Sequence, residues 1–155
     1  AYAGPAGTNN VQVFPAMAVD RGGNRHVAFS ACGTGHTNCQ IQLVSSADQG
    51  NTWLGAVQVS NGATTATAVE PTISAGSAGV VDITWLGSAA ATPDVFPNAW
   101  HGFFAQTQNA MAASPTFSQN QAETATKHDF DICFNVLPFA ANPNAAPGNP
   151  HLLAS

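Results

Sequence analysis

The stretch Ser46-Ala47-Asp48-Gln49-Gly50-Asn51-Thr52-Trp53 carries the strongest structural signal in this chain of 155 residues. A short acidic side chain such as that of Asp48 can accept hydrogen bonds from backbone N–H groups of its own turn. Gly50 supplies a left-handed backbone conformation that other residues adopt reluctantly. Trp53 is expected to bury a large ring against a sheet, which stabilises a fold by about 1.5–3 kcal/mol. The stretch therefore predicts a stapled turn between two strands.

Five positions of this stretch, Ser46, Asp48, Gly50, Thr52 and Trp53, match the pattern Ser-x-Asp-x-Gly-x-Thr-Trp. The pattern resembles the Asp-box, or BNR repeat, of the sialidase superfamily, and the chain is similar to secreted, bacterial-type members of that family. The resemblance implies a β-propeller of six or seven blades, each a four-stranded antiparallel sheet. It also implies a structural Asp-box, because in the family this turn lies at the blade edge, away from the active-site face.

The rest of the chain has the short alternating runs and intervening turn residues of an all-β protein. In one such run Val27, Phe29 and Ala31 alternate and are expected to share the apolar face of a strand. Residues 108–113 are the only helix-like stretch, and Pro115 ends it. The clearest expected strands are 26–31, 39–45, 80–86 and 102–107, and the shorter ones are 16–19, 57–60, 72–75 and 118–123.

The sequence also repeats itself weakly, with an offset of 56 residues. Pro15 opens a run that reaches Gly23 and then Val-Ala-Phe, and Pro71 opens a run that reaches Gly79 and then Ile-Thr-Trp. A period of about 40–60 residues with four strands per unit is typical of propeller blades. We therefore expect one partial propeller domain over 1–155, with a first blade over about 11–60, a second over about 67–125, and a loop and the start of a third over about 126–155.

Charged residues are scarce, since three basic and eight acidic side chains give a net charge of −5. Without a basic stripe, the chain lacks the phosphate contacts of a nucleic-acid-binding protein and the cationic anchor of a membrane-surface protein. It also lacks the run of about 18 apolar residues that membrane insertion requires. Hydrophobic residues make up 45% of the chain, which is enough for a packed core. An uncharged surface rich in Ala, Asn, Thr and Ser favours an extracellular or cell-surface protein.

Two of the three cysteines, Cys32 and Cys39, bracket a short polar segment between two expected strands. In a secreted protein this position favours a disulfide across the hairpin, and two reduced, half-buried thiols are the alternative. A zinc site is disfavoured, because a spacing of seven residues is not a usual zinc knuckle. Cys133 has no evident partner in the sequence.

By the same resemblance, a working sialidase needs three arginines that grip the substrate carboxylate, a Tyr–Glu nucleophile pair and an aspartic acid/base. Where the family carries Arg-Ile-Pro, this chain reads Val13-Phe14-Pro15. Its two arginines, Arg21 and Arg25, flank a Gly-Gly turn and are expected to be solvated hairpin charges, and its one tyrosine is Tyr2. We therefore expect no catalytic residues and no cofactor in this chain.

Four residues are candidate contacts for a ligand or ion: Asp94, Trp100, Asp129 and Asp131. Asp94 lies in a loop that can face the centre of a propeller, with a solvated turn residue as the alternative. Trp100 can stack on a sugar ring or pack in the core. Asp129 and Asp131 alternate in a loop, so their oxygens can point at one calcium ion, and a plain polar loop is the alternative.

His26 and Asp82 occupy equivalent strand positions opposite the apolar face. We expect both to be exposed polar residues rather than an acid/base pair.

The functional hypothesis is an extracellular, sialidase-like propeller that acts as a non-catalytic binding or structural module, with a glycan as the candidate ligand. The alternative is a fragment of an exo-sialidase-type glycoside hydrolase whose catalytic residues lie outside this chain. Two isolated blades leave apolar faces in water. The expected partners are therefore the remaining blades of a longer parent chain, or identical copies that close a ring.

Overall fold

A computed structural model of the protein describes residues 14–34, 37–61, 65–93 and 98–127, and these ranges fold as an all-β structure. Within them, no helix is long and apolar enough to cross a membrane. All eight expected strands are present, and β5 begins five residues earlier than predicted. The strands are β1 (Ala16–Val19), β2 (Arg25–Ala31), β3 (Gln40–Ser46), β4 (Val57–Gln58), β5 (Thr67–Ala75), β6 (Val81–Ser88), β7 (His101–Thr107) and β8 (Ser118–Gln121).

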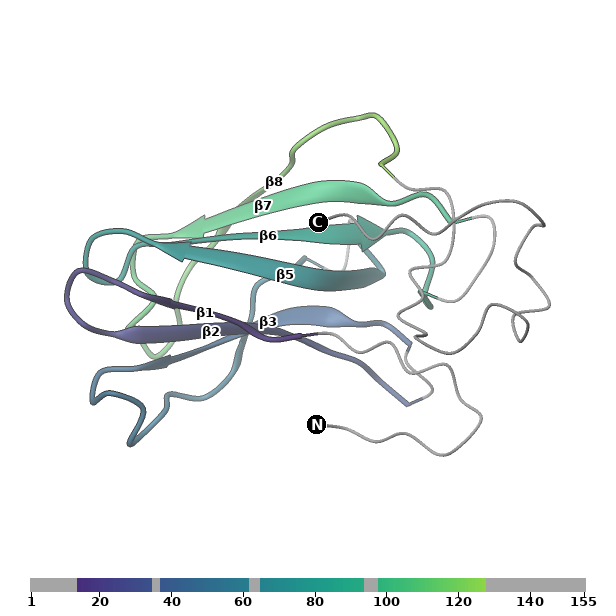
Figure 1. The fold of residues 1–155 in the computed structure, drawn as a ribbon. Helices are drawn as coiled ribbons and strands as arrows, with labels where there is room; N and C mark the ends of the chain where they lie inside the picture. Colours follow the sequence, from purple (N-terminus) through teal and green to yellow (C-terminus); the bar gives the residue numbers. More distant parts are fainter. Residues whose placement is uncertain (1–13, 35–36, 62–64, 94–97, 128–155) are drawn as a thin grey trace, which may run out of the picture.

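The strands form two four-stranded antiparallel sheets that lie one above the other (Figure 1). In each sheet every strand pairs with the next along the chain, in the orders β1-β2-β3-β4 and β5-β6-β7-β8. The boundary between the sheets falls between β4 and β5. Each sheet is therefore a four-stranded antiparallel meander.

The equivalence of the two units extends to backbone conformation and strand register. Gly23 in the β1–β2 turn and Gly79 in the β5–β6 turn both have a left-handed backbone, with φ of 83° and 78°. His26 pairs with Ser45 across β2 and β3, and Asp82 pairs with Gln106 across β6 and β7. The weak sequence repeat is thus a structural repeat.

A hydrophobic core fills the space between the sheets. The first sheet contributes small and medium side chains, and the second contributes the larger aromatic ones. The Trp85 and Phe103 rings stack with their centroids 5.9 Å apart, a contact that adds about 0.5–1.5 kcal/mol to their burial. The buried members of this core are Ala28, Ile41, Leu43, Val59, Ala68, Val81, Ile83, Trp85, Phe103, Ala105 and Ala110.

The two sheets use different faces in this contact. In β2 the fully buried side chains are at even positions, His26 and Ala28, whereas in β6 they include the odd positions Val81 and Ile83. The repeat offset of 56 residues is even, so an even-numbered residue of the first unit is equivalent to an even-numbered residue of the second. The first sheet buries even positions and the second buries odd positions, so the two buried faces are not equivalent. The sheets therefore stack head to tail. The outer face of each sheet is equivalent, by the repeat, to the face that the other sheet buries.

Val27, Phe29 and Ala31 share one face of β2, and that face is not the one that packs against the second sheet. Val27 and Phe29 are half-buried on the outer side of the first sheet, and Ala31 is exposed. The reason is that large side chains of the second sheet fill the space between the sheets, and the small Ala28 faces them.

A β-bulge explains why β5 extends beyond its predicted start. The pairing of β5 with β6 shifts register between Val69 and Thr72, and Glu70 in this bulge has a positive φ of 55°. Pro71 lacks an N–H group and is tolerated within a strand at such a bulge. The strand continues past the proline instead of starting after it.

The helix expected over 108–113 is absent, and the segment forms a turn. Asn109 N–H donates to the Thr107 hydroxyl, and Asn109 Oδ1 accepts the Thr116 N–H at 3.0 Å. These side-chain bonds to nearby backbone groups compete with helical hydrogen bonds. The Ala110 N–H instead donates to the Gly79 carbonyl of the β5–β6 turn at 2.9 Å.

Candidate functional site

A buried carboxylate lies where two turns of the stacked sheets meet. Asp20 follows β1 directly, and the β1–β2 and β5–β6 turns lie at the same end of the stack, at the left of Figure 1. The Gly79 N–H donates to Asp20 Oδ2 at 2.7 Å, and the Arg21 N–H donates to the Gly76 carbonyl at 2.9 Å. Asp20 thus ties the first sheet to the second.

The same carboxylate also organises its own hairpin. Asp20 Oδ1 accepts the N–H groups of Gly22 and Asn24 at 2.8 and 3.0 Å, and Oδ2 accepts Asn24 Nδ2 at 2.9 Å. His26 Nε2 lies 3.1 Å from Oδ2. One side chain therefore gathers donors from the turn, from β2 and from the second sheet.

His26 connects this carboxylate to β3. Its ring is fully buried, with Nε2 on Asp20 and Nδ1 2.8 Å from the Ser45 hydroxyl. A nucleophilic triad uses the same three residue types, but with Nε2 toward serine and Nδ1 toward aspartate. Here the ring atoms are reversed, and Ser45 is only 2% exposed. Because a substrate cannot reach this hydroxyl, the Asp20–His26–Ser45 array holds strands together and does not perform nucleophilic catalysis.

The electrostatics of Asp20 agree with a structural role. Burial alone raises the pKa of the carboxyl group, but hydrogen bonds from Gly79, Asn24 and His26 outweigh burial and hold the pKa well below its usual range. Asp20 is therefore ionised in the folded protein at neutral pH. Its charge strengthens the hydrogen bonds that it accepts.

The prediction of an exposed side chain was wrong for His26, and Asp82 is half-buried. The two positions are equivalent, but only His26 is covered by the neighbouring sheet. One sequence signal could have indicated the array: the run Asp20-Arg21-Gly22-Gly23-Asn24 is typical of a turn capped by the aspartate side chain, which lies beside the start of β2.

The stretch from Ser46 to Trp53 forms the hairpin turn between β3 and β4. Asp48 Oδ1 accepts the Thr52 N–H and the Ser46 hydroxyl at 2.8 Å each, and Oδ2 accepts the Thr52 hydroxyl at 2.6 Å. Ser46 Oγ in turn accepts the Gly50 N–H at 2.8 Å. Gly50 has the expected left-handed backbone, with φ of 90°. The motif is a closed set of hydrogen bonds within one turn.

Trp53, the last residue of the motif, is less buried than expected. Its side chain is 43% exposed, and the indole N–H donates to the Gly50 carbonyl at 3.1 Å. A Cβ atom added to Gly50 would lie 3.5 Å from both Trp53 Cζ2 and Arg25 Nη1, so these two side chains flank the turn.

The Asp-box carboxylate is expected to titrate with an altered pKa. Hydrogen bonds from the Thr52 side chain and backbone, and then from Ser46, lower the pKa of Asp48 from 3.8 to about 2. The unfolded chain therefore binds more protons between these values, so the Asp48 contribution to stability is complete above about pH 5 and is lost as the pH falls toward 2. We expect Thr52→Val to raise the Asp48 pKa, measured by NMR titration of the carboxyl carbon. Thr116→Val is the control and should leave it unchanged, and equal midpoints in all three proteins would contradict the assignment.

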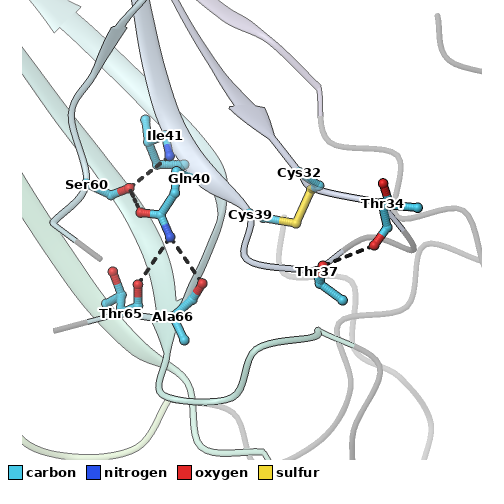
Figure 2. The surroundings of a disulfide bond; sticks show 9 residues. All are labelled: Cys32, Thr34, Thr37, Cys39, Gln40, Ile41, Ser60, Thr65 and Ala66. Carbon is cyan, nitrogen blue, oxygen red and sulfur yellow. Dashed lines mark hydrogen bonds between the residues drawn. A yellow bond between two sulfur atoms is a disulfide. The ribbon is translucent and has the colours of Figure 1, made fainter. Parts of the chain in front are cut away.

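The opposite end of the stack carries the disulfide. Cys32 and Cys39 are joined across the β2–β3 hairpin, as predicted, with an S–S distance of 2.00 Å (Figure 2). Cys39 is fully buried against Val69 and Trp100, and its carbonyl accepts the Ala68 N–H at 2.7 Å. The disulfide thus closes the hairpin, and Cys39 itself holds the hairpin against β5 of the second sheet.

Gln40 forms a second link beside the disulfide (Figure 2). Its Nε2 donates to the carbonyls of Thr65 and Ala66, at 3.3 and 3.1 Å, in the segment that leads into β5. Its Oε1 accepts the Ser60 hydroxyl at 2.6 Å, and Ser60 Oγ accepts the Ile41 N–H at 2.9 Å. These bonds join β3, the end of the first unit and the start of the second.

Two buried polar side chains, Thr67 and Asn98, lie near the Ser88 hydroxyl and each has an atom without a hydrogen-bond partner among the described residues. Thr67 pairs with Ser88 across β5 and β6, and the Ser88 hydroxyl donates to Asn98 Oδ1. In the part of the chain that the structure describes, Thr67 Oγ1 and Asn98 Nδ2 have no hydrogen-bond partner. A buried polar group without a partner is costly unless water or a ligand completes it.

Of the other sequence candidates, Trp100 lies within the described residues. Trp100 is fully buried, and this burial favours core packing over stacking on a sugar ring. Asp94, Asp129 and Asp131 lie outside the described residues, as does Cys133. Among the residues that are described, no three His, Cys, Asp or Glu side chains cluster closely enough to hold a metal ion.

No protein-family model matches the sequence, and no curated protein matches it either. The arrangement of strands and side chains therefore carries the assignment of function. In the described ranges, that arrangement is two stacked sheets, tied at one end by Asp20 and at the other by the Cys32–Cys39 hairpin.

Proposed function

We propose that the chain forms two consecutive blades of a sialidase-like Asp-box β-propeller and serves outside the cell as a non-catalytic structural or binding module. The observation that carries this proposal is the head-to-tail stacking of two equivalent meander sheets. A contact between non-equivalent faces can be repeated by further units, and such heterologous contacts close into rings or continue as open arrays. A contact between equivalent faces would instead use the same surface on both sheets, so no further unit could add to the pair by the same contact.

The chemistry of the described residues supports a non-catalytic role. The Ser–His–Asp array is sealed between the sheets, and its serine is out of reach of a substrate. The sequence holds two arginines, Arg21 and Arg25, so it cannot supply the three guanidinium groups that the family resemblance requires for a sialic-acid carboxylate. The Asp-box side chains are engaged with one another within their own turn.

The disulfide supports an extracellular location. Thiols are kept reduced in the cytosol, and disulfides persist mainly in oxidising compartments. The Cys32–Cys39 bond joins two strands of a small domain, one of its ends fully buried.

The proposal is tested by two measurements on the whole chain. In the first, the release of 4-methylumbelliferone from its α-sialoside is followed alongside an active sialidase, and we expect no release above the buffer blank. Sustained turnover would overturn the non-catalytic assignment in favour of a glycoside hydrolase. In the second, fluorescently labelled protein is applied to a glycan array. Selective retention would indicate a binding module, and no retention a structural one.

A further inference from the structure

The outer faces of the two sheets differ in character. On the first sheet, Met17, Val27 and Val44 form a cross-strand row, and Met17 is 63% exposed. On the second sheet, Thr72 and Thr84 share a hydrogen bond of 2.6 Å, and Gln106 Nε2 donates to Asp82 Oδ1 at 2.7 Å. The first outer face is thus mainly apolar, with Gln42 paired to Phe29 on it, and the second combines these polar groups with Phe104, the cross-strand partner of Thr84.

The contact already formed also brings two non-equivalent faces together. The first sheet contributes Ala28, Ile41 and Leu43 to it, with the His26–Ser45 pair on the same face, and the second contributes Ile83 and Trp85. By the 56-residue offset, the outer face of the second sheet is equivalent to the face that carries His26, and the outer face of the first is equivalent to the face that carries Ile83. An outer first-sheet face placed on an outer second-sheet face would therefore bring together the equivalents of the two faces that are already in contact.

The equivalence also predicts which groups would meet. The His26–Ser45 pair lies beside the β5–β6 turn, because His26 and the Gly79 N–H converge on one oxygen of Asp20. The equivalent of that pair is Asp82–Gln106. The equivalent of the β5–β6 turn is the β1–β2 turn, which carries Arg21 and is followed directly by Arg25, the first residue of β2.

We propose that a second copy of this chain docks head to tail, placing its apolar first-sheet face on the outer face of the second sheet, with its Arg25 opposite Asp82. The inference rests on the proposed blade arrangement and names the partner for it. Two of the three basic residues in the chain lie on this hairpin, and a carboxylate lies at the position that would face them. Charge complementarity and continuity with the existing sheet contact thus identify the occupant as another copy.

The experiment measures association of the whole chain by analytical ultracentrifugation at low salt over a range of concentrations. Wild-type protein is expected to form species whose masses are multiples of 15.8 kDa. Arg25→Glu and Asp82→Arg each place like charges at the contact, and each is expected to weaken association about tenfold or more. The double variant Arg25→Glu/Asp82→Arg restores opposite charges at every contact and is expected to recover association.

Lys127→Glu is the matched control, since it makes the same change in charge on an exposed residue beyond β8 and should leave association unchanged. Circular dichroism of each variant separates a lost contact from a lost fold. A folded wild-type monomer at every concentration, or single variants that associate like wild type, would overturn the interface. Either result would leave the propeller proposal standing, because blades of a longer chain can cover the same faces. Sialoside turnover, by contrast, would overturn the proposed function and leave the interface between copies untouched.

Discussion

Replacing Asp20 by alanine is expected to lower the free energy of unfolding by about 3–5 kcal/mol. The change leaves the Gly79 N–H and the His26 ring buried without their acceptor and removes the side-chain link between the sheets. The measurement is urea unfolding followed by tryptophan fluorescence. Asp82→Ala is the control, because Asp82 is half-buried and accepts one hydrogen bond from Gln106, and its loss should cost about 1 kcal/mol. Similar losses for both variants would contradict the assigned role of Asp20.

The acid limb of the stability curve provides a separate test of Asp20. Its folded pKa lies below the unfolded value near 3.9, so its contribution to stability is complete above about pH 5 and is lost as the pH falls below that value. Asp20→Asn removes this titration and should flatten the fall in unfolding free energy between about pH 5 and 3. A residual slope is expected from Asp48, whose pKa is also lowered. An unchanged slope in Asp20→Asn would show that the folded pKa of Asp20 is ordinary.

Loss of the Cys32–Cys39 disulfide is expected to cost about 2–5 kcal/mol. The bond lowers the conformational entropy of the unfolded chain by joining two residues with a sequence separation of seven. In the folded protein it fixes the hairpin in which Cys39 packs against Trp100 and Val69. The measurement compares thermal unfolding of the wild type, with and without reductant, and of Cys32→Ala/Cys39→Ala.

Reductant should lower the midpoint of the wild type and leave that of the double variant unchanged. An equal response in both proteins would assign the effect of reduction to another part of the chain. No difference between the oxidised wild type and the double variant would show that the bond contributes nothing to stability.

The sequence predicted the features that depend on near neighbours. Alternating side chains and turn residues located all eight strands, the position of Cys32 and Cys39 between two strands indicated their bond, and the spacing of Asp48 and Gly50 indicated a turn held by the aspartate. Each of these is settled within about ten residues of chain. The β5 bulge was missed because a proline ordinarily ends a strand, and only pairing with β6 on both sides of Pro71 keeps the strand intact.

The choice of buried face was not predictable from the strand itself. Val27 and Phe29 are more apolar than His26 and Ala28, yet the latter pair is buried. His26 is buried against Asp20, and Asp20 also accepts the N–H of Gly79, which lies 59 residues further along the chain. This N–H reaches the carboxylate only when the sheets stack. A polar side chain on a strand is therefore a weak guide to exposure when another sheet can supply its partners.

The head-to-tail contact has a consequence for how such a chain can evolve. An in-frame gene duplication that added another repeat unit would present the new sheet with a face that it already fits, so lengthening the array requires no newly invented surface. The two existing units would not be equal templates, because the position of Asp20 is occupied by Gly76 in the second unit. A descendant of the first unit would inherit the carboxylate that clamps its successor, and a descendant of the second would have to regain it by mutation.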